Sequence, residues 1–202
     1  TSKGIAFTEA PLVHEPGGFI PFARIAKKTV SIPIIAVGRI ELQEAEKGLS
    51  AGDFDFVAMG RKLLADPDIP NKISTGNTEL IRPCIYCYIC VSQIFINQPM
   101  TCAVNARLGK EYMNENIICS TAQQKNILII GAGPSGMEAA RLLGEQGHKV
   151  QIWDRDKDIG GTVRVAALAY EPNGHLIDYL KNALDNLGIS ISLNTEATLD
   201  NI

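Results

Sequence analysis

Apolar and polar positions change their spacing several times along the chain, and each change predicts an element. Residues 22–30 (FARIAKKTV) have the amphipathic spacing of a helix. Residues 31–40 (SIPIIAVGRI) and 54–61 (FDFVAMGR) are apolar runs that predict strands buried on both faces, and each ends in Gly-Arg. Residues 41–52 predict a helix that ends at Gly52. This alternation is typical of strands and helices around a parallel sheet.

The rest of the chain returns to the same alternation after an irregular stretch. Residues 63–73 predict a helix and turn broken by two prolines, and residues 79–122 predict an irregular segment that carries cysteines. Residues 123–156 predict strand, glycine turn, helix and strand in that order. Apolar positions in residues 176–187 have helical spacing, and residues 188–194 predict the next strand. The whole pattern predicts an α/β protein.

Composition narrows the classes of partner. The 202 residues are 46% hydrophobic and 20% charged, with a formal net charge of −3, which is typical of a globular protein. An acidic balance provides no general attraction to nucleic acid. No apolar run approaches the roughly 20 residues of a membrane helix, and no secretion signal is recognisable. The chain begins at Thr1 and stops just after a predicted strand, so we expect it to be a piece of a longer polypeptide.

The two Gly-Arg pairs predict a phosphate site. Glycine lets an anion approach the backbone, N–H groups at a helix start point toward it, and arginine adds a forked cation. The pairs occur at 37–39 (VGR) and 59–61 (MGR), within one short stretch of chain. In (β/α)8 barrels such a site often follows the last two strands. The alternative for each pair is a strand-end turn with a surface arginine.

A glycine turn follows the strand NILII. Gly131, Gly133 and Gly136 have the G-x-G-x-x-G spacing, and Asp154 ends the next predicted strand. This context predicts a dinucleotide site, with the pyrophosphate at a helix N-terminus and the carboxylate on a ribose hydroxyl. A second glycine pair at 160–161 is typical of FAD-binding variants. The alternative for Asp154 is a solvated strand end.

Four of the five cysteines are closely spaced. Two residues separate Cys84 from Cys87 and Cys87 from Cys90, and Cys102 follows. Four thiolates at this spacing predict ligands of a [4Fe–4S] cluster in a reducing compartment. A structural zinc site is the second interpretation, and it leaves the third cysteine of the run unused. Cys119 has no spacing partner and is expected to be structural.

These motifs together resemble the 2,4-dienoyl-CoA reductase / 2-enoate reductase family. It is the multi-domain branch of the old yellow enzymes, related to trimethylamine dehydrogenase. The matching segments are SIPIIAVGRI, VAMGRKLLADPDIPNK, IRPCIYCYIC, TCAVNARLGKE and IIGAGPSGMEAA, in family order over most of residues 20–200. The order of barrel end, cluster segment and dinucleotide turn is more specific than any one motif.

The resemblance implies three segments and their cofactors. Residues 1–78 would be the C-terminal part of an FMN-binding TIM barrel, residues 79–122 a [4Fe–4S] linker, and residues 123–202 the start of a Rossmann-like FAD-binding domain. The family's cofactor contacts fall on Arg39, Gly60 and Arg61 for FMN, on Cys84, Cys87, Cys90 and Cys102 for the cluster, and on Gly131, Gly133, Gly136, Asp154 and Gly161 for FAD.

The resemblance also implies an electron relay. NAD(P)H would reduce FAD, the cluster would carry single electrons to FMN, and FMN would deliver hydride to the activated C=C bond of a small enoate or enoyl-CoA substrate. The implied protein is cytoplasmic, with no nucleic-acid or membrane partner, and a homo-oligomer is compatible with it. The family's proton donors lie in earlier barrel strands, so no catalytic acid or base is named here.

The sequence departs from the family pattern at three places, and the first of them leaves the substrate class open. Two residues lie between the second and third cysteines, as in the amine dehydrogenase, whereas three lie between them in dienoyl-CoA reductases. The usual Asn-Pro after the fourth cysteine is Asn105-Ala106, and the ribose acid is Asp154 where glutamate is commoner. The cysteine spacing keeps an amine dehydrogenase as an alternative, and a zinc-stapled nucleotide-binding module is an alternative from another class. The choice between NADH and NADPH is open.

Overall fold

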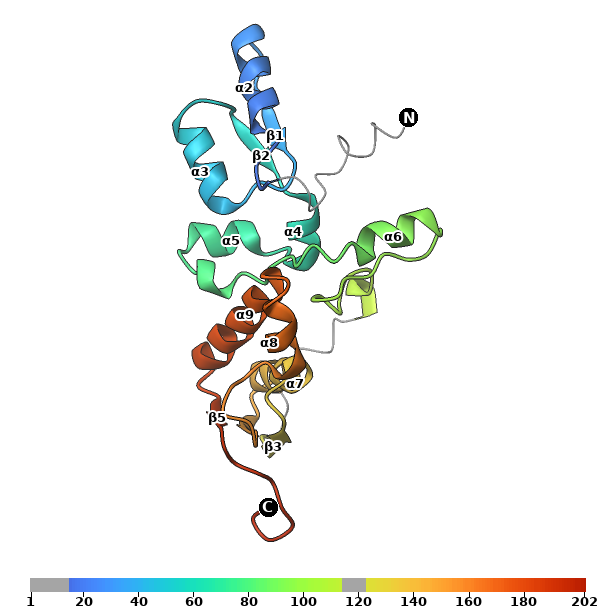
Figure 1. Cartoon of the computed structure of the whole chain (residues 1–202), viewed down its shortest axis with the longest axis vertical. Coiled ribbons are helices and arrows are strands. Elements are labelled where there is room, and N and C mark those ends of the chain that lie inside the picture. Colours follow the sequence, from blue (N-terminus) through green and yellow to red (C-terminus); the bar gives the residue numbers. More distant parts are fainter. Residues whose placement is uncertain (1–14, 114–122) are drawn as a thin grey trace. The chain divides into compact units, whose positions relative to one another are not determined.

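The computed structural model describes residues 15–113 and 123–202 and divides the chain into two compact units (Figure 1). The first unit ends at Arg61 and the second begins at Lys62. Each described unit contains one small parallel sheet with helices. The predicted α/β class is therefore confirmed. No helix within the described ranges is both long and apolar enough to cross a membrane.

The first unit is built on a parallel strand pair. Its described elements run α2 (Ile20–Thr29), β1 (Ile35–Val37), α3 (Leu42–Ser50) and β2 (Phe56–Ala58). Both predicted strands and both predicted helices are present. The register pairs Ala36 with Val57. Because the strands are parallel, their carboxyl ends lie at the same edge of the sheet.

Only one face of this sheet is covered by the described elements. Ala36 and Phe54 are buried with residues of α2 and α3, and Gly48 leaves space for the Phe54 ring. In contrast, Ile35, Val37 and Phe56 are 61%, 57% and 58% exposed. The expectation of strands buried on both faces is wrong for this chain, because both helices pack on the same side of the pair.

Two ion pairs connect α2 to the turn before β2. Arg24 donates two hydrogen bonds to Asp53, at 2.6 and 2.7 Å. Lys27 donates to Asp55 at 2.7 Å, and the backbone N–H of Ile34 donates to the same carboxylate at 2.8 Å. The Lys27 hydrogen bond, and then that of Ile34, lower the pKa of Asp55 below its usual value. These pairs set the position of the amphipathic helix.

The second unit begins with short helices. They are α4 (Gly60–Ala65), whose first two residues still belong to the first unit, α5 (Ile69–Ser74), η1 (Thr78–Leu80), α6 (Ile89–Phe95) and η2 (Glu111–Met113). The prediction that residues 79–122 are irregular is thus partly wrong, because α6 lies within this range. Residues 85–95 contain neither glycine nor proline, so nothing in that stretch prevents a helix.

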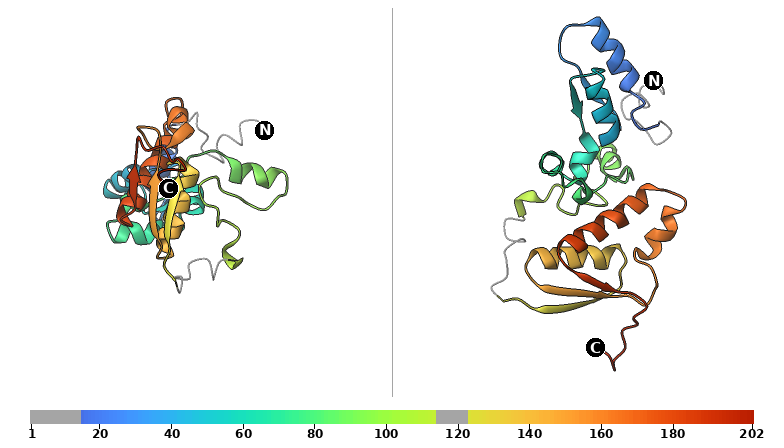
Figure 2. Two further views of the ribbon diagram at one scale, coloured as in Figure 1. Left: turned by 90° about the horizontal axis from the view of Figure 1, so that it is seen from below. Right: turned by 90° about the vertical axis from the view of Figure 1, so that its left-hand side faces the viewer.

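The remainder of the second unit is a three-stranded parallel sheet. Its elements in chain order are β3 (Asn126–Ile130), α7 (Pro134–Glu145), β4 (Lys149–Trp153), α8 (Gly161–Ala167), α9 (Pro172–Asn186) and β5 (Ser190–Ser192). The strand order is β3-β4-β5, as in one half of a doubly wound sheet. Figure 2 shows α7 and α9 on one side of this sheet.

The core of this sheet domain forms between β4 and these two helices. Met137, Ile152 and Leu184 have no exposed surface, and Leu180 packs with them. Along β4, Val150 and Ile152 face the core while Lys149 and Gln151 are exposed, which is the alternation of a strand covered on one face. All predicted strands and the helix over residues 176–187 are present. The helix α8 was not predicted.

Candidate cofactor-binding site

The glycine turn has the backbone that its spacing predicts. Gly131 follows β3 with φ +107°, in a region that favours glycine, and its N–H donates to the carbonyl of Trp153 at 2.7 Å. Gly133 is the N-cap of α7. A Cβ at Gly136 would overlap the carbonyl oxygen of Gly131, so the third glycine is needed for the close approach of helix and turn.

The outer side of this turn is open. A Cβ built on Gly131 or Gly133 would meet no atom within 4 Å. The turn leads into α7, which has 12 residues and whose first N–H groups have no partner within the helix. A phosphate at this point would accept hydrogen bonds from the backbone and gain from the helix dipole. The turn therefore fits the predicted pyrophosphate.

The second glycine pair lies against the first turn. The N–H of Gly160 donates to the carbonyl of Ala132 at 2.8 Å. Gly160 has φ +94°, and a Cβ there would lie 2.5 Å from Ile177. A Cβ at Gly161 would lie 3.4 Å from the Cα of Gly133. The fold thus brings together Gly131, Gly133, Gly136 and Gly161, which are separated by up to 30 positions in the sequence.

Asp154 is a structural partner of the same turn. One carboxylate oxygen accepts the N–H of Ala132 at 2.6 Å, and the other accepts the N–H of Asp156 at 2.8 Å. Each oxygen keeps a second lone pair, so a ribose hydroxyl can still donate to it. The side chain lies beside the predicted nucleotide position, and it also holds the shape of the turn.

The two Gly-Arg pairs follow neighbouring parallel strands of the first unit. Gly38 and Arg39 come directly after β1, with φ +113° and +48°. Gly60 begins α4 two residues after β2, and Arg61 follows it. Because β1 and β2 are parallel neighbours, both pairs lie at the same edge of the sheet. Nε of Arg39 and Nη1 of Arg61 are buried. This placement suits a shared anion.

The cysteine segment winds tightly. Tyr86 and Tyr88 alternate with the first three cysteines and have φ +50° and +61°, a left-handed conformation that is uncommon for residues with side chains. Cys90 is buried in α6, Cys84 and Cys102 are half-buried, and Cys87 is exposed. None of these four described cysteines is in a disulfide. These four thiols, three of them within residues 84–90, have the donor chemistry that an iron–sulfur cluster requires.

The described residues contain no group of three or more His, Cys, Asp or Glu side chains placed to hold a metal ion. A zinc ion needs its ligands around one centre, whereas each thiolate of a [4Fe–4S] cluster binds a different iron. The cluster ligands Cys84, Cys87, Cys90 and Cys102 therefore stay a prediction.

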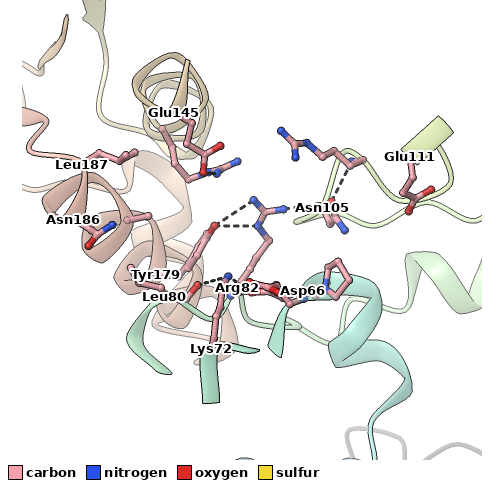
Figure 3. A pocket seen from close by; sticks show the side chains of 16 residues that line it. Asp66, Lys72, Leu80, Arg82, Asn105, Glu111, Glu145, Tyr179, Asn186 and Leu187 are labelled. Atoms are coloured by element: carbon pink, nitrogen blue, oxygen red, sulfur yellow. Dashed lines mark hydrogen bonds and ion pairs between the residues drawn. The ribbon is translucent and has the colours of Figure 1, made fainter. Parts of the chain in front are cut away.

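Sequence reasoning missed a pocket of about 780 Å³ in the second unit, centred on Arg82 (Figure 3). The Arg82 side chain is only 13% exposed and donates to Tyr179 Oη from two nitrogens, at 3.2 and 3.3 Å. It also donates to Asn105 at 3.4 Å and to Glu138 at 3.5 Å. Arg82 thus joins the cysteine segment to α7 and α9.

A carboxylate organises the other side of this pocket. Asp66, which is 5% exposed, accepts hydrogen bonds from Lys72 Nζ at 2.6 Å and from the backbone N–H of Arg82 at 2.7 Å. Asn105 Nδ2 donates to the carbonyl of Leu64 at 2.9 Å. The sequence holds one hint of this pocket, the arginine and proline that directly precede Cys84. The partners of Arg82 in α7 and α9 lie too far along the chain for a local pattern to reveal them.

Two segments of the chain match known domain families. Residues 17–79 match the NADH:flavin oxidoreductase / NADH oxidase family, and residues 129–191 match the NAD(P)-binding Rossmann-like domain. The first match includes both Gly-Arg pairs, and the second begins within β3 and includes the glycine turn. The cysteine segment lies between them.

Whole-chain similarity extends to reductases. The chain is 43% identical to a metal reductase of Desulforamulus reducens over 93% of this chain and 28% of the relative. It is 34% identical to a cinnamate reductase of Clostridium sporogenes over 97% of this chain and 30% of the relative. A solved 2-naphthoyl-CoA reductase complex matches with a TM-score of 0.91 and 37% identity, over 95% of this chain and 30% of that one.

The chain spans less than a third of the length of each of these relatives. Their likeness covers both units, including the segment between the two matched domains. The chain therefore joins a segment of an NADH:flavin oxidoreductase / NADH oxidase domain to an NAD(P)-binding Rossmann-like domain.

Proposed function

We propose that the natural full-length protein is an NAD(P)H-dependent flavin oxidoreductase that reduces the activated C=C bond of an enoate or enoyl-CoA type substrate. The observation that carries this proposal is the order of parts on one chain. A flavin-oxidoreductase segment, a four-cysteine segment and a nucleotide-binding turn follow one another, and two relatives that match over nearly the whole chain are named for reducing cinnamate and 2-naphthoyl-CoA.

In this proposal each part of the chain binds one cofactor. Arg39, Gly60 and Arg61 hold the phosphate of FMN at the common edge of β1 and β2. The backbone around Gly131, Gly133, Gly136 and Gly161 receives the pyrophosphate of FAD, and Asp154 accepts a ribose hydroxyl. The thiolates of Cys84, Cys87, Cys90 and Cys102 hold a [4Fe–4S] cluster. We place the protein in the cytoplasm because thiolate ligands need a reducing compartment.

When bound, these groups supply hydride transfer at the flavins and single-electron transfer at the cluster. The chain's own residues bind and orient them. Arg39 and Arg61 provide charge against a phosphate, and the open side of the glycine turn admits a backbone-bound anion. None of the residues described here is assigned as a proton donor to the substrate.

The test is acceptor-dependent oxidation of NAD(P)H by the natural full-length protein without oxygen. The panel contains cinnamate, an enoyl-CoA, an enone and ferric citrate, each with NADH and with NADPH. We expect at least one unsaturated compound to be consumed together with the nicotinamide, giving the saturated product. Reduction of ferric citrate alone would overturn the substrate class. Flavin reduction by dimethylamine or trimethylamine, with no alkene consumed, would support the amine dehydrogenase alternative.

A further inference from the structure

The cysteine segment is attached to the nucleotide-binding domain on both sides of Cys84. Tyr170 Oη donates to the backbone carbonyl of Ile85 at 2.8 Å, across 85 positions of sequence. Two positions before Cys84, Arg82 donates to Tyr179 Oη at 3.2 and 3.3 Å, across 97 positions. The guanidinium carbon also lies 5.5 Å from the centre of the Tyr179 ring. Figure 3 shows Arg82 directed at this tyrosine.

The contacts of Arg82, Tyr170 and Tyr179 lie in a partly buried polar interface. Tyr179 is 7% exposed, and the Arg82 side chain is 13% exposed. Asn182, also on α9, donates to the carbonyl of Glu79 at 3.3 Å. A charged donor in a partly desolvated position makes a stronger hydrogen bond than a neutral one in water. The cysteine segment is therefore bound to α9 at several points.

Tyr170 also links the cysteine segment to the glycine turn. Tyr170 comes three positions after α8, and α8 begins at Gly161 beside Gly133. The helix has seven residues, and that number of residues rises about 10 Å. One short helix thus connects the predicted pyrophosphate position to the peptide between Cys84 and Cys87.

We propose that Tyr170 and Tyr179 are positioning residues for electron transfer between the nucleotide-binding domain and the cysteine segment. They hold Cys84 and its neighbours at a fixed place on α8 and α9. With a flavin at the glycine turn and a cluster on the cysteines, electrons supplied by NAD(P)H would pass from the first group, which would be oxidised, to the second, which would be reduced, and the two tyrosines would fix the segment that carries the thiolates. This inference rests on the proposed function for the identity of the two redox groups.

The test uses Tyr170→Phe, Tyr179→Phe and the double variant in the natural full-length protein. Phenylalanine keeps the ring and removes only the hydroxyl. Tyr112→Phe is the matched control, because Tyr112 is 81% exposed. The first readout is hydrogen exchange of residues 82–90 measured by mass spectrometry. The second is the anaerobic stopped-flow rate at which cluster absorbance falls after NADH has reduced the flavin. Iron and flavin contents are measured on every sample.

We expect exchange to become about fivefold faster in Tyr170→Phe, which loses one neutral hydrogen bond, and about tenfold faster in Tyr179→Phe, which loses the charge-assisted hydrogen bonds from Arg82. The stopped-flow rate should fall at least severalfold in the double variant while iron, flavin and the Tyr112→Phe control stay at wild-type values. Unchanged exchange would overturn the docking role, and faster exchange with an unchanged transfer rate would overturn the electron-transfer role. Wild-type protein without iron would instead contradict the proposed function, and the exchange readout would still test the docking.

Discussion

The carboxylate of Asp154 accepts a hydrogen bond from the backbone N–H of Ala132 at 2.6 Å. This contact joins the end of β4 to the middle of the glycine turn after β3. Its second oxygen accepts the N–H of Asp156 at 2.8 Å. The residue predicted to bind a ribose therefore also fixes the turn that would bind the pyrophosphate.

Asp154→Asn should weaken both the support of the glycine turn and the predicted contact with the ribose. An amide has one oxygen, so one of the two backbone N–H groups loses its acceptor, at a cost of about 1–3 kcal/mol if that group is left unsatisfied. We expect a lower melting temperature for the FAD-free protein and weaker FAD binding. Thermal unfolding and a flavin titration measure the two effects. Weaker FAD binding with unchanged unfolding would show that Asp154 acts on the ribose alone.

The glycines of the turn differ in what they tolerate. A Cβ at Gly136 would overlap the carbonyl oxygen of Gly131, whereas one at Gly133 would meet nothing within 4 Å. Gly136→Ala should therefore destabilise the domain by about 1–3 kcal/mol through overpacking. Gly133→Ala should keep the melting temperature and lose FAD affinity, because its methyl group would occupy the space of the pyrophosphate. Equal behaviour of the two variants in unfolding and binding would contradict this assignment.

The first unit should weaken in acid through Asp55. The hydrogen bonds from Lys27 and from the backbone of Ile34 lower the pKa of this carboxyl in the folded state. A depressed folded pKa contributes stability that is present above the unfolded value, about 3.9, and is lost as pH falls through the folded value. Asp55→Asn should therefore unfold at a lower temperature than wild type near pH 7, and the difference should shrink below about pH 4.

Scanning calorimetry of the natural full-length protein across this range measures that difference. Thr29→Val is a suitable comparison, because the Thr29 hydroxyl donates to the carbonyl of Ile25 and does not titrate. Its effect on the melting temperature should show no such pH dependence. A gap between wild type and Asp55→Asn that stays constant from pH 7 to pH 3 would mean that the Lys27 and Ile34 contacts do not contribute through the charge of Asp55.

Arg61 should control retention of the flavin in the first unit. Hydrogen bonds to charged groups are worth about 1.5–3 kcal/mol, so Arg61→Ala should weaken FMN binding about tenfold or more. Arg24→Ala is the control, because Arg24 lies in the same unit and pairs with Asp53 at the surface. Fluorescence titration of the deflavinated full-length protein with FMN gives both affinities. Equal losses would indicate a general effect on the unit rather than a phosphate contact.

Local patterns predicted much of the fold because they act over a few residues. The glycine spacing predicted the turn at Gly131, because that turn needs a backbone conformation that favours glycine. The spacing of apolar residues predicted the position of each described strand. The pattern could not show that Ile35 and Val37 are exposed, because exposure depends on which elements cover the sheet. It also could not reveal that Arg82 meets Tyr179, since 97 positions separate them.

Metal analysis of the natural full-length protein purified without oxygen tests most directly whether the cysteines hold an iron–sulfur cluster beside flavins. We predict about four irons and four sulfides per chain with flavin absorbance. Replacing Cys87 by serine should lower the iron, and replacing Cys119 should not. Stoichiometric zinc with no iron or acid-labile sulfide would contradict the cluster and the electron relay that depends on it.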